Sequence, residues 1–277
     1  MIKYKFWIGF LLSTLTPVLL AAQSSEPSLK SVTVSLDYTI PADKSRKEAE
    51  ALLLKRARKK AVEKAMGISV QTADVMMTTE SGNNYFESYQ QLVRNVVSGR
   101  IVEEKTPDYK IIDDGKLTIT YSCQVAEAQG EVDPGFKVDL RANKRAFTVG
   151  EPLQLEVSVS KDAYITVFSI TDDNRVSVLF PNQYMPDNRV NAYEVRKIPN
   201  AKEQQVISFN LQPDPQEPES NYAELLFCVA TKSKISYKEL TDKLNYSSNW
   251  IELNRWLMEI PRDQWTEAYL PYQVFPK

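Results

Sequence analysis

The chain has 277 residues, of which 43% are hydrophobic and 25% are charged, and its formal net charge is −2. These values are ordinary for a globular protein, and a typical domain size of about 150 residues gives roughly two domains. The absence of histidine and the presence of only two cysteines exclude histidine-based catalytic triads, histidine-containing zinc sites and four-thiolate metal sites.

The N-terminal segment has the layout of a secretory signal peptide. Lys3 and Lys5 precede a mostly apolar run over residues 6–20, which ends at two alanines. We predict that residues 1–22 are removed on export and that the mature protein resides in the periplasm or at the outer surface of a bacterium. A retained membrane anchor is the alternative, but the apolar run is shorter than the roughly 20 residues of a spanning helix.

The first module, residues 23–129, is predicted to be an α/β domain that begins with a strand and a long helix. Residues 31–40 alternate between apolar and polar side chains, as in a half-buried strand. Ser45 and Glu48 match a capping box that starts a helix, and Gly67 is suited to end it. Small side chains at four-residue spacing predict a buried helix stripe of Ala49, Leu53, Ala57, Ala61 and Ala65.

The rest of this module is predicted as a second helix and a strand pair. Aromatic and aliphatic residues at helical spacing place the second helix over residues 85–98. A strand follows over residues 100–105. Asp114-Gly115 is a typical hairpin turn, and residues 116–125 form the return strand. The predicted order is therefore strand, helix, helix, strand, strand.

Residues 130–135 contain glycine and proline and are predicted to be a linker to a second domain, residues 136–277. Short strand-like runs separated by polar turns are typical of a β-sandwich. The runs are 136–141, 153–159, 164–170, 176–180, 206–211 and 222–230. Two short helices (237–244 and 250–258) and an extended segment (265–275) close the chain. The predicted fold class is thus α+β, a small α/β domain followed by a β-sandwich with C-terminal helices.

The two cysteines lie in separate predicted strands. Export to an oxidising compartment would allow Cys123 and Cys228 to form a disulfide between the domains. The alternative is that each is a small buried hydrophobic residue.

The first module resembles the N-terminal domain of the flagellar assembly protein T family. The resemblance rests on the first strand, the alanine-rich helix over residues 49–67, and the segments 89–93 and 99–101 that lead into the strand pair. It implies an α/β fold for this module.

The second module resembles an uncharacterised bacterial domain that is often appended to caspase-like peptidases, kinases or envelope modules. Its most specific part is Leu179-Phe180-Pro181-Asn182. The other segments that carry the resemblance are 147–153, 164–168, 198–199, 255–257 and 260–261. The resemblance implies an accessory module with no demonstrated chemistry.

The long helix carries a basic face that is a candidate contact for an anionic surface. Its candidate residues are Lys55, Arg56, Lys59 and Lys60. Such a face would suit anionic lipid headgroups or an acidic polymer such as peptidoglycan. The alternative is the solvated face of an ordinary amphipathic helix. Nucleic acid is not an expected partner, because the whole chain is slightly acidic.

Aromatic residues are concentrated near the C-terminus and form a second candidate site. A stacked platform containing Trp256 and Trp265 would bind glycan. The alternative is that these rings fill the core between the terminal helices and the sandwich, because Trp256 falls at helical spacing with Leu253 and Leu257.

Catalysis is not expected. The carboxylate pairs Glu103-Glu104, Asp113-Asp114 and Asp172-Asp173 lie in a strand or in turns, whereas acid–base catalysis needs two carboxylates in distinct environments across a cleft. The sequence contains no phosphate-binding glycine motif. We therefore predict no catalytic, cofactor-binding or metal-binding residues.

These observations predict an exported, non-catalytic envelope protein that acts as a protein-interaction or assembly module with a protein partner in the envelope. A glycan-binding or glycan-processing envelope protein is the alternative. A surface-exposed aromatic cluster would favour the glycan function, and a buried cluster would favour the interaction module.

Overall fold

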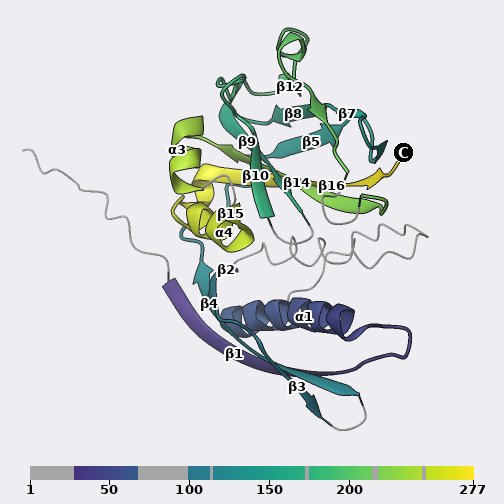
Figure 1. Ribbon diagram of the computed structural model, residues 1–277. Coiled ribbons are helices and arrows are strands. Elements are labelled where there is room, and N and C mark those ends of the chain that lie inside the picture. Colours follow the sequence, from purple (N-terminus) through teal and green to yellow (C-terminus); the bar gives the residue numbers. More distant parts are fainter. Residues whose placement is uncertain (1–27, 68–98, 113–114, 172–174, 214–217, 245–247) are drawn as a thin grey trace, which may run out of the picture.

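The computed structural model describes residues 28–67, 99–112, 115–171, 175–213, 218–244 and 248–277 (Figure 1). The predicted signal peptide, the predicted helix over residues 85–98 and the pairs Asp113-Asp114 and Asp172-Asp173 lie outside the described residues. No helix in the described residues has the length and apolar character needed to span a membrane.

The N-terminal part is a four-stranded antiparallel sheet covered on one face by a helix (Figure 1). Its strands are β1 (Ser28–Thr39), β2 (Gly99–Glu104), β3 (Asp108–Ile112) and β4 (Lys116–Glu127). The central strand β4 pairs with β1 along its whole length, and β2 and β3 both pair with its other edge. The predicted first strand and the predicted strands 100–105 and 116–125 are therefore confirmed. The sequence analysis missed β3, which lies between the latter two along the chain and directly precedes the predicted turn.

Helix α1 (Arg46–Met66) begins and ends where its sequence predicts. The Ser45 side chain accepts a hydrogen bond from the Glu48 amide, the Glu48 carboxylate accepts one from the Ser45 amide, and Gly67 ends the helix in the left-handed conformation. The small side chains of the stripe let the helix lie close to the sheet. Its residues Ala49, Leu53, Ala57 and Ala61 are fully buried against apolar residues of the sheet.

The C-terminal part is built on a seven-stranded sheet, in the order β15-β10-β9-β14-β16-β6 with β11 paired to β9. Its strands are β6 (Ala146–Thr148), β9 (Ala163–Ile170), β10 (Arg175–Phe180), β11 (Arg189–Val190), β14 (Tyr222–Thr231), β15 (Ser248–Asn249) and β16 (Trp265–Phe275). The predicted closing segment thus becomes the long strand β16, which is antiparallel to β14 and parallel to β6.

Smaller sheets face one side of this large sheet. One has the order β12-β8-β5 and the other pairs β13 with β7. Their strands are β5 (Val138–Ala142), β7 (Pro152–Leu153), β8 (Leu155–Val159), β12 (Val195–Ile198) and β13 (Phe209–Asn210). Leu155 and Val157 of β8 lie in one buried cluster with Val167 of β9 and Leu226 of β14. This arrangement confirms the predicted α+β class with a sandwich-like C-terminal part.

Two short helices cover the other face of the large sheet. Both α3 (Tyr237–Lys243) and α4 (Trp250–Met258) begin at capping boxes, formed by Ser236 with Glu239 and by Asn249 with Glu252. The rings of α4 pack on β9 and β14. For example, the ring centres of Trp256 and Phe168 lie 5.8 Å apart. The predicted terminal helices are confirmed.

The predicted strand over residues 206–211 is shorter than expected. Only Phe209–Asn210 is a strand, and a single 3-10 turn occupies Glu203–Gln205. The Asn200 side chain accepts hydrogen bonds from the Lys202 and Glu203 amides and so stabilises this turn. The amides of Val206 and Ile207 both donate to the Glu203 carbonyl at 2.9 Å, so the first two residues of the predicted strand close the turn instead.

Both cysteines are free and buried. Cys123 lies in the core under α1, and Cys228 lies in the core of the sandwich. Burial raises the pKa of Cys123 to about 11 and raises that of Cys228 further. Of the two alternatives, the buried hydrophobic role therefore describes these thiols.

Candidate functional site

The basic face of α1 is only partly available to a partner. Lys55 and Lys59 are half-buried, whereas Arg56 and Lys60 are exposed. The Arg56 guanidinium lies 5.0 Å from the centre of the Tyr38 ring, and the Lys60 ammonium is 4.0 Å from the Glu63 carboxylate. A surface contact of this kind adds little stability, so these cations stay able to interact with an external anion.

Lys64 lies on the same face, beyond the four candidate contact residues. Its ammonium donates a hydrogen bond of 2.9 Å to the Thr33 carbonyl of β1. Arg56, Lys60 and Lys64 are spaced by four residues and therefore lie on one side of the helix. We call these three residues the basic row. Their contacts with Tyr38 and Thr33 place the row beside β1.

Arg58 belongs to the same helix but has a structural role. Its guanidinium binds both carboxylate oxygens of Glu104, at 2.6 and 3.0 Å, and the Tyr121 hydroxyl donates to the same carboxylate at 2.7 Å. Burial alone would raise the pKa of Glu104, but the hydrogen bonds and charge of Arg58 outweigh it and hold the pKa below its usual value. Glu104 therefore joins β2 to α1, and its neighbour Glu103 is exposed. This pair does not form an acid–base dyad.

The proposed glycan platform is not supported, because both tryptophans are buried. Trp256 is 4% exposed and Trp265 is 1% exposed. The Arg262 guanidinium lies 4.0 Å from the Trp265 ring centre, the Arg100 guanidinium lies 5.3 Å from it, and the indole nitrogen donates to the Ile260 carbonyl. A sugar needs an open ring face for stacking, and neither ring offers one. Both rings lie in the buried core, as the alternative interpretation expects.

A buried polar cluster joins the N-terminal sheet to the C-terminal part. Arg100 of β2 donates to the Glu267 carboxylate of β16 at 2.6 Å and to the Asn254 side chain of α4 at 3.1 Å. Asn254 in turn donates to the Ile101 carbonyl, and Arg255 donates to the Val102 carbonyl. We call Arg100, Asn254 and Glu267 the junction cluster. Burial alone would lower the pKa of Arg100, but the Glu267 charge raises it above its usual value.

Sequence reasoning missed the junction cluster. Asn254 and Glu267 lie 154 and 167 positions after Arg100 along the chain, so no local spacing could pair them with it. Apolar contacts accompany it, because Val102 and Ala126 of the N-terminal sheet lie in the same buried cluster as Trp250 and Leu253 of α4. The segment predicted as a linker also carries contacts, since Asp133 binds both Lys161 and Lys232.

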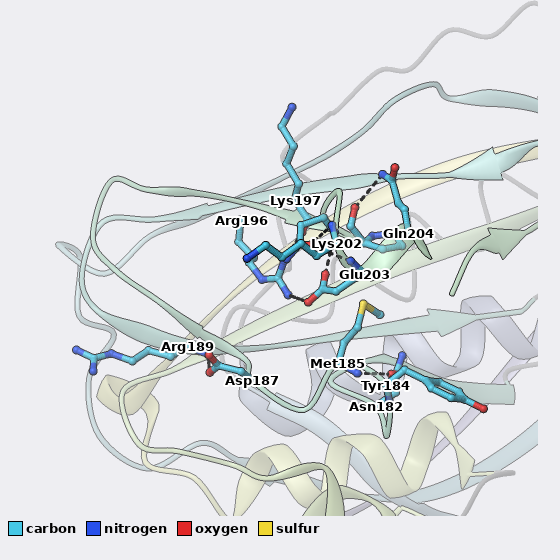
Figure 2. Close-up of polar contacts among 12 residues, drawn as sticks. Asn182, Tyr184, Met185, Asp187, Arg189, Arg196, Lys197, Lys202, Glu203 and Gln204 are labelled. Carbon is cyan, nitrogen blue, oxygen red and sulfur yellow. Dashed lines mark hydrogen bonds and ion pairs between the residues drawn. The ribbon is translucent and has the colours of Figure 1, made fainter. Parts of the chain in front are cut away.

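The loops of the C-terminal part form a second polar cluster on the surface (Figure 2). After the cis peptide bond at Phe180-Pro181, the Asn182 side chain accepts hydrogen bonds from the Tyr184 and Met185 amides at 3.0 and 2.9 Å. It also donates to the Leu179 carbonyl at 2.8 Å. One side chain thus holds the whole turn in shape.

The neighbouring loop is held by an ion pair. Arg196 and Glu203 bind each other in Figure 2, and their side chains are 16% and 17% exposed. Arg196 belongs to β12, and its guanidinium also lies 5.2 Å from the Phe180 ring centre, which connects β12 to β10, the strand before Asn182. The Glu203 carboxylate also accepts a hydrogen bond of 2.8 Å from the Asn200 amide. These groups satisfy one another, and none of them pairs a nucleophile with a base.

Two tyrosines on the loops before β11 and β12 have exposed side chains. Tyr184 is 55% exposed and Tyr193 is 82% exposed. Tyr193 has a φ of 64°, a left-handed conformation that is uncommon for a bulky residue, and its amide donates to the Val159 carbonyl at 2.7 Å. The Asp162 carboxylate accepts a hydrogen bond of 2.9 Å from the amide of Ala192, the residue before Tyr193. The backbone is thus fixed while the ring is left in solvent.

The described residues contain no group of histidine, cysteine or carboxylate side chains suited to a metal ion. Residues 146–218 match the family described as "Domain of unknown function (DUF4384)". This match confirms, in its coarser form, the resemblance of the second module to an uncharacterised domain, and it contains the loops of Figure 2. A search among curated proteins found no match.

Proposed function

We propose that this chain is an exported, non-catalytic envelope protein that acts as a protein-interaction or assembly module in the periplasm or at the outer surface of a bacterium. The observation that carries the proposal is the pair of exposed tyrosines, Tyr184 and Tyr193, on loops that hydrogen bonds hold in place. Tyrosine is enriched at protein interfaces, and a loop fixed beforehand loses little entropy on binding.

The arrangement of the charged side chains supports a non-catalytic role. Glu104 and Glu267 are engaged by arginines, and the half-buried Glu224 accepts hydrogen bonds from Ser169 and Tyr272. A general acid or base must reach a substrate, whereas these carboxylates hold strands and helices together. The glycan-binding alternative depended on Trp256 and Trp265, and their burial gives it no support.

The family resemblances fit an accessory role. The second module is similar to domains found beside caspase-like peptidases and kinases, and the first is similar to the N-terminal domain of flagellar assembly protein T. Both would serve a protein that connects other envelope components. The signal-like segment over residues 1–22 supports export.

Fractionation and crosslinking test the proposal. The full chain should appear in the envelope fraction without residues 1–22, and crosslinking in intact cells should recover a defined protein partner. Replacing Tyr184 by alanine and Tyr193 by asparagine, which tolerates a positive φ, should reduce recovery of that partner at an unchanged melting temperature. Ile111→Ala is the matched control, since Ile111 is 56% exposed on β3. A chain that keeps Met1 in the cytosol, or binds purified peptidoglycan instead of protein, would contradict the proposal.

A further inference from the structure

Among the described strands, β1 pairs only with β4, so its outer edge presents backbone groups that could pair with another strand. Two hydrogen bonds establish which groups these are. The Lys105 amide of the β2 side donates to the Ser122 carbonyl of β4, and the Ile40 amide donates to the Gly115 carbonyl. In an antiparallel pair, opposite residues alternate between exchanging both bonds and exchanging none. Since Ser122 bonds toward β2, its opposite residue Thr33 points its backbone groups away from β4.

The same alternation applies along the strand. The odd-numbered residues Ser31, Thr33, Ser35 and Asp37 direct their amides and carbonyls outward. Among the residues that the structure describes, the Thr33 carbonyl is the only backbone group of these four with a partner on this edge, namely Lys64. β1 has 12 residues and is one of the two longest strands in the part of the chain that the structure describes, so this edge is long for one that no described strand pairs with. A row of unpaired amides and carbonyls is a template for adding a strand.

The basic row lies beside this edge. Arg56 contacts Tyr38 near one end of β1, and Lys64 contacts Thr33 near its middle, so α1 runs antiparallel to β1 with Lys60 between these two contacts. Residues four apart on a helix are separated by about 6 Å along its axis. Alternate residues of a strand are separated by about 6.6 Å and point to the same side. The spacing of the three cations therefore matches every second side chain of an added strand.

We infer that β1 binds an extended acidic segment of a partner protein by strand addition. The backbone of that segment pairs with Ser31, Thr33, Ser35 and Asp37, and three of its acidic side chains, at every second position, reach Arg56, Lys60 and Lys64. The ammonium of Lys64 leaves the Thr33 carbonyl, which then accepts an amide of the added strand. The inference rests on the proposed function for its partner being a protein, but it concerns a different surface from Tyr184 and Tyr193.

A defined peptide tests the inference with the full chain. The probe is a fluorescein-labelled peptide of about nine residues, a usual strand length, with glutamate at every second position and threonine between. Fluorescence anisotropy should show saturable binding that weakens as salt is added. A peptide of the same composition with its glutamates in one block should bind about tenfold more weakly, because only alternate side chains share one face of a strand. A peptide with lysine in place of glutamate should not bind.

Variants separate the backbone contribution from the charge contribution. Ser35→Pro removes one outward amide without breaking the ladder to β4 and should abolish binding, whereas Ser35→Ala should bind normally. Lys60→Glu with Lys64→Glu should weaken binding at least about tenfold, the change expected for two charge reversals. Lys110→Glu on β3, whose side chain is 71% exposed, is the control and should bind as the parent does.

A second probe keeps the test decisive if Ser35→Pro lowers the melting temperature. The alternating peptide with every second amide N-methylated should not bind to the parent chain, because it cannot complete the ladder. Binding of this peptide, or equal binding of the block peptide, would overturn strand addition in favour of non-specific charge attraction.

Two other outcomes would assign this surface to a different occupant. Capture by phosphatidylglycerol vesicles that needs Lys60 and Lys64 but not the Ser35 amide, with no peptide binding, would assign the basic row to a membrane. A dimer of the chain that Ser35→Pro dissociates, again without peptide binding, would assign the edge to a second copy.

Crosslinking distinguishes failure of this inference from failure of the proposed function. A photo-crosslinking residue at Ser35 should capture an envelope protein through an acidic segment, and one at Lys110 should not. If partners are recovered but none crosslinks at Ser35, the β1 inference fails and the proposed function stands. If no envelope protein is recovered by any route, the proposed function fails, and peptide binding alone decides the β1 inference.

Discussion

Removing Arg100 should destabilise the protein more than removing any single exposed cation. Its side chain is 4% exposed, and that of its partner Glu267 is 6% exposed. In Arg100→Met the Glu267 carboxylate stays buried without its counter-charge, and its second oxygen already lacks a hydrogen-bond partner among the described residues. Breaking one side of such a pair costs about 3–5 kcal/mol. For a chain of this size that corresponds to a fall in melting temperature of roughly 10 °C.

A double variant shows whether the loss comes from the orphaned charge. Arg100→Met with Glu267→Met removes both charges, and apolar replacements of a buried pair are often neutral. We therefore expect the double variant to recover more than half of the stability lost in Arg100→Met. The control is Arg141→Met. Its partner is Asp139, and the two side chains are 73% and 55% exposed, so the loss should be under about 1 kcal/mol.

Urea unfolding followed by tryptophan fluorescence measures these differences, because Trp265 lies against Arg100. The midpoint should fall in Arg100→Met while the slope of the transition stays the same. If Arg100→Met loses no more stability than Arg141→Met, the junction is solvated in solution. The claim that Arg100 joins the two parts of the molecule would then be refuted.

Three further predictions concern the helix, the aromatic core and acid stability. Ala57→Glu places a charge in the fully buried stripe of α1 and should lower the free energy of unfolding by more than about 2 kcal/mol in chemical unfolding. The control Lys60→Glu should change it by no more than about 0.5 kcal/mol, and equal losses would contradict the assigned helix face. Trp256→Ala removes a buried ring and should lower the free energy of unfolding by about 3–5 kcal/mol. Neither the parent protein nor the variant should be retained on peptidoglycan. If the parent is retained and the variant loses that retention at unchanged stability, the glycan function would be restored. Because the pKa of Glu104 is lowered in the folded state, its contribution to stability is present above its unfolded value of 4.5 and is lost as the pH falls through its folded pKa. Glu104→Gln should flatten the stability profile in that acidic range, and an unchanged profile would show that Glu104 is solvated.

Local sequence signals determined where most described elements begin and end. The capping boxes at Ser45 and Asn249 and the left-handed Gly67 act within a few residues, so the boundaries of α1 and α4 could be predicted without knowing their neighbours. The period of the apolar residues also identified the buried stripe of α1 and the helical placement of Trp256. Where a local turn competed with that period, the expected strand was cut short, because the amides of Val206 and Ile207 bond to the Glu203 carbonyl.

Only the tertiary structure decided which of these residues meet. The pair Arg100 and Glu267 forms because β2 and β16 come together at the junction, and neither residue differs locally from an exposed charge. Burial likewise separated the core role of Trp265 from a binding role, since its flanking residues Gln264 and Thr266 gave no periodic signal. The free edge of β1 depends on the pairing register with β4, and the basic row acquires its position from the packing of α1 on that sheet. Helix caps and periodicity arise from neighbouring residues along the chain, whereas pairing, burial and free edges arise from contacts between distant segments, and those exist only once the chain has folded.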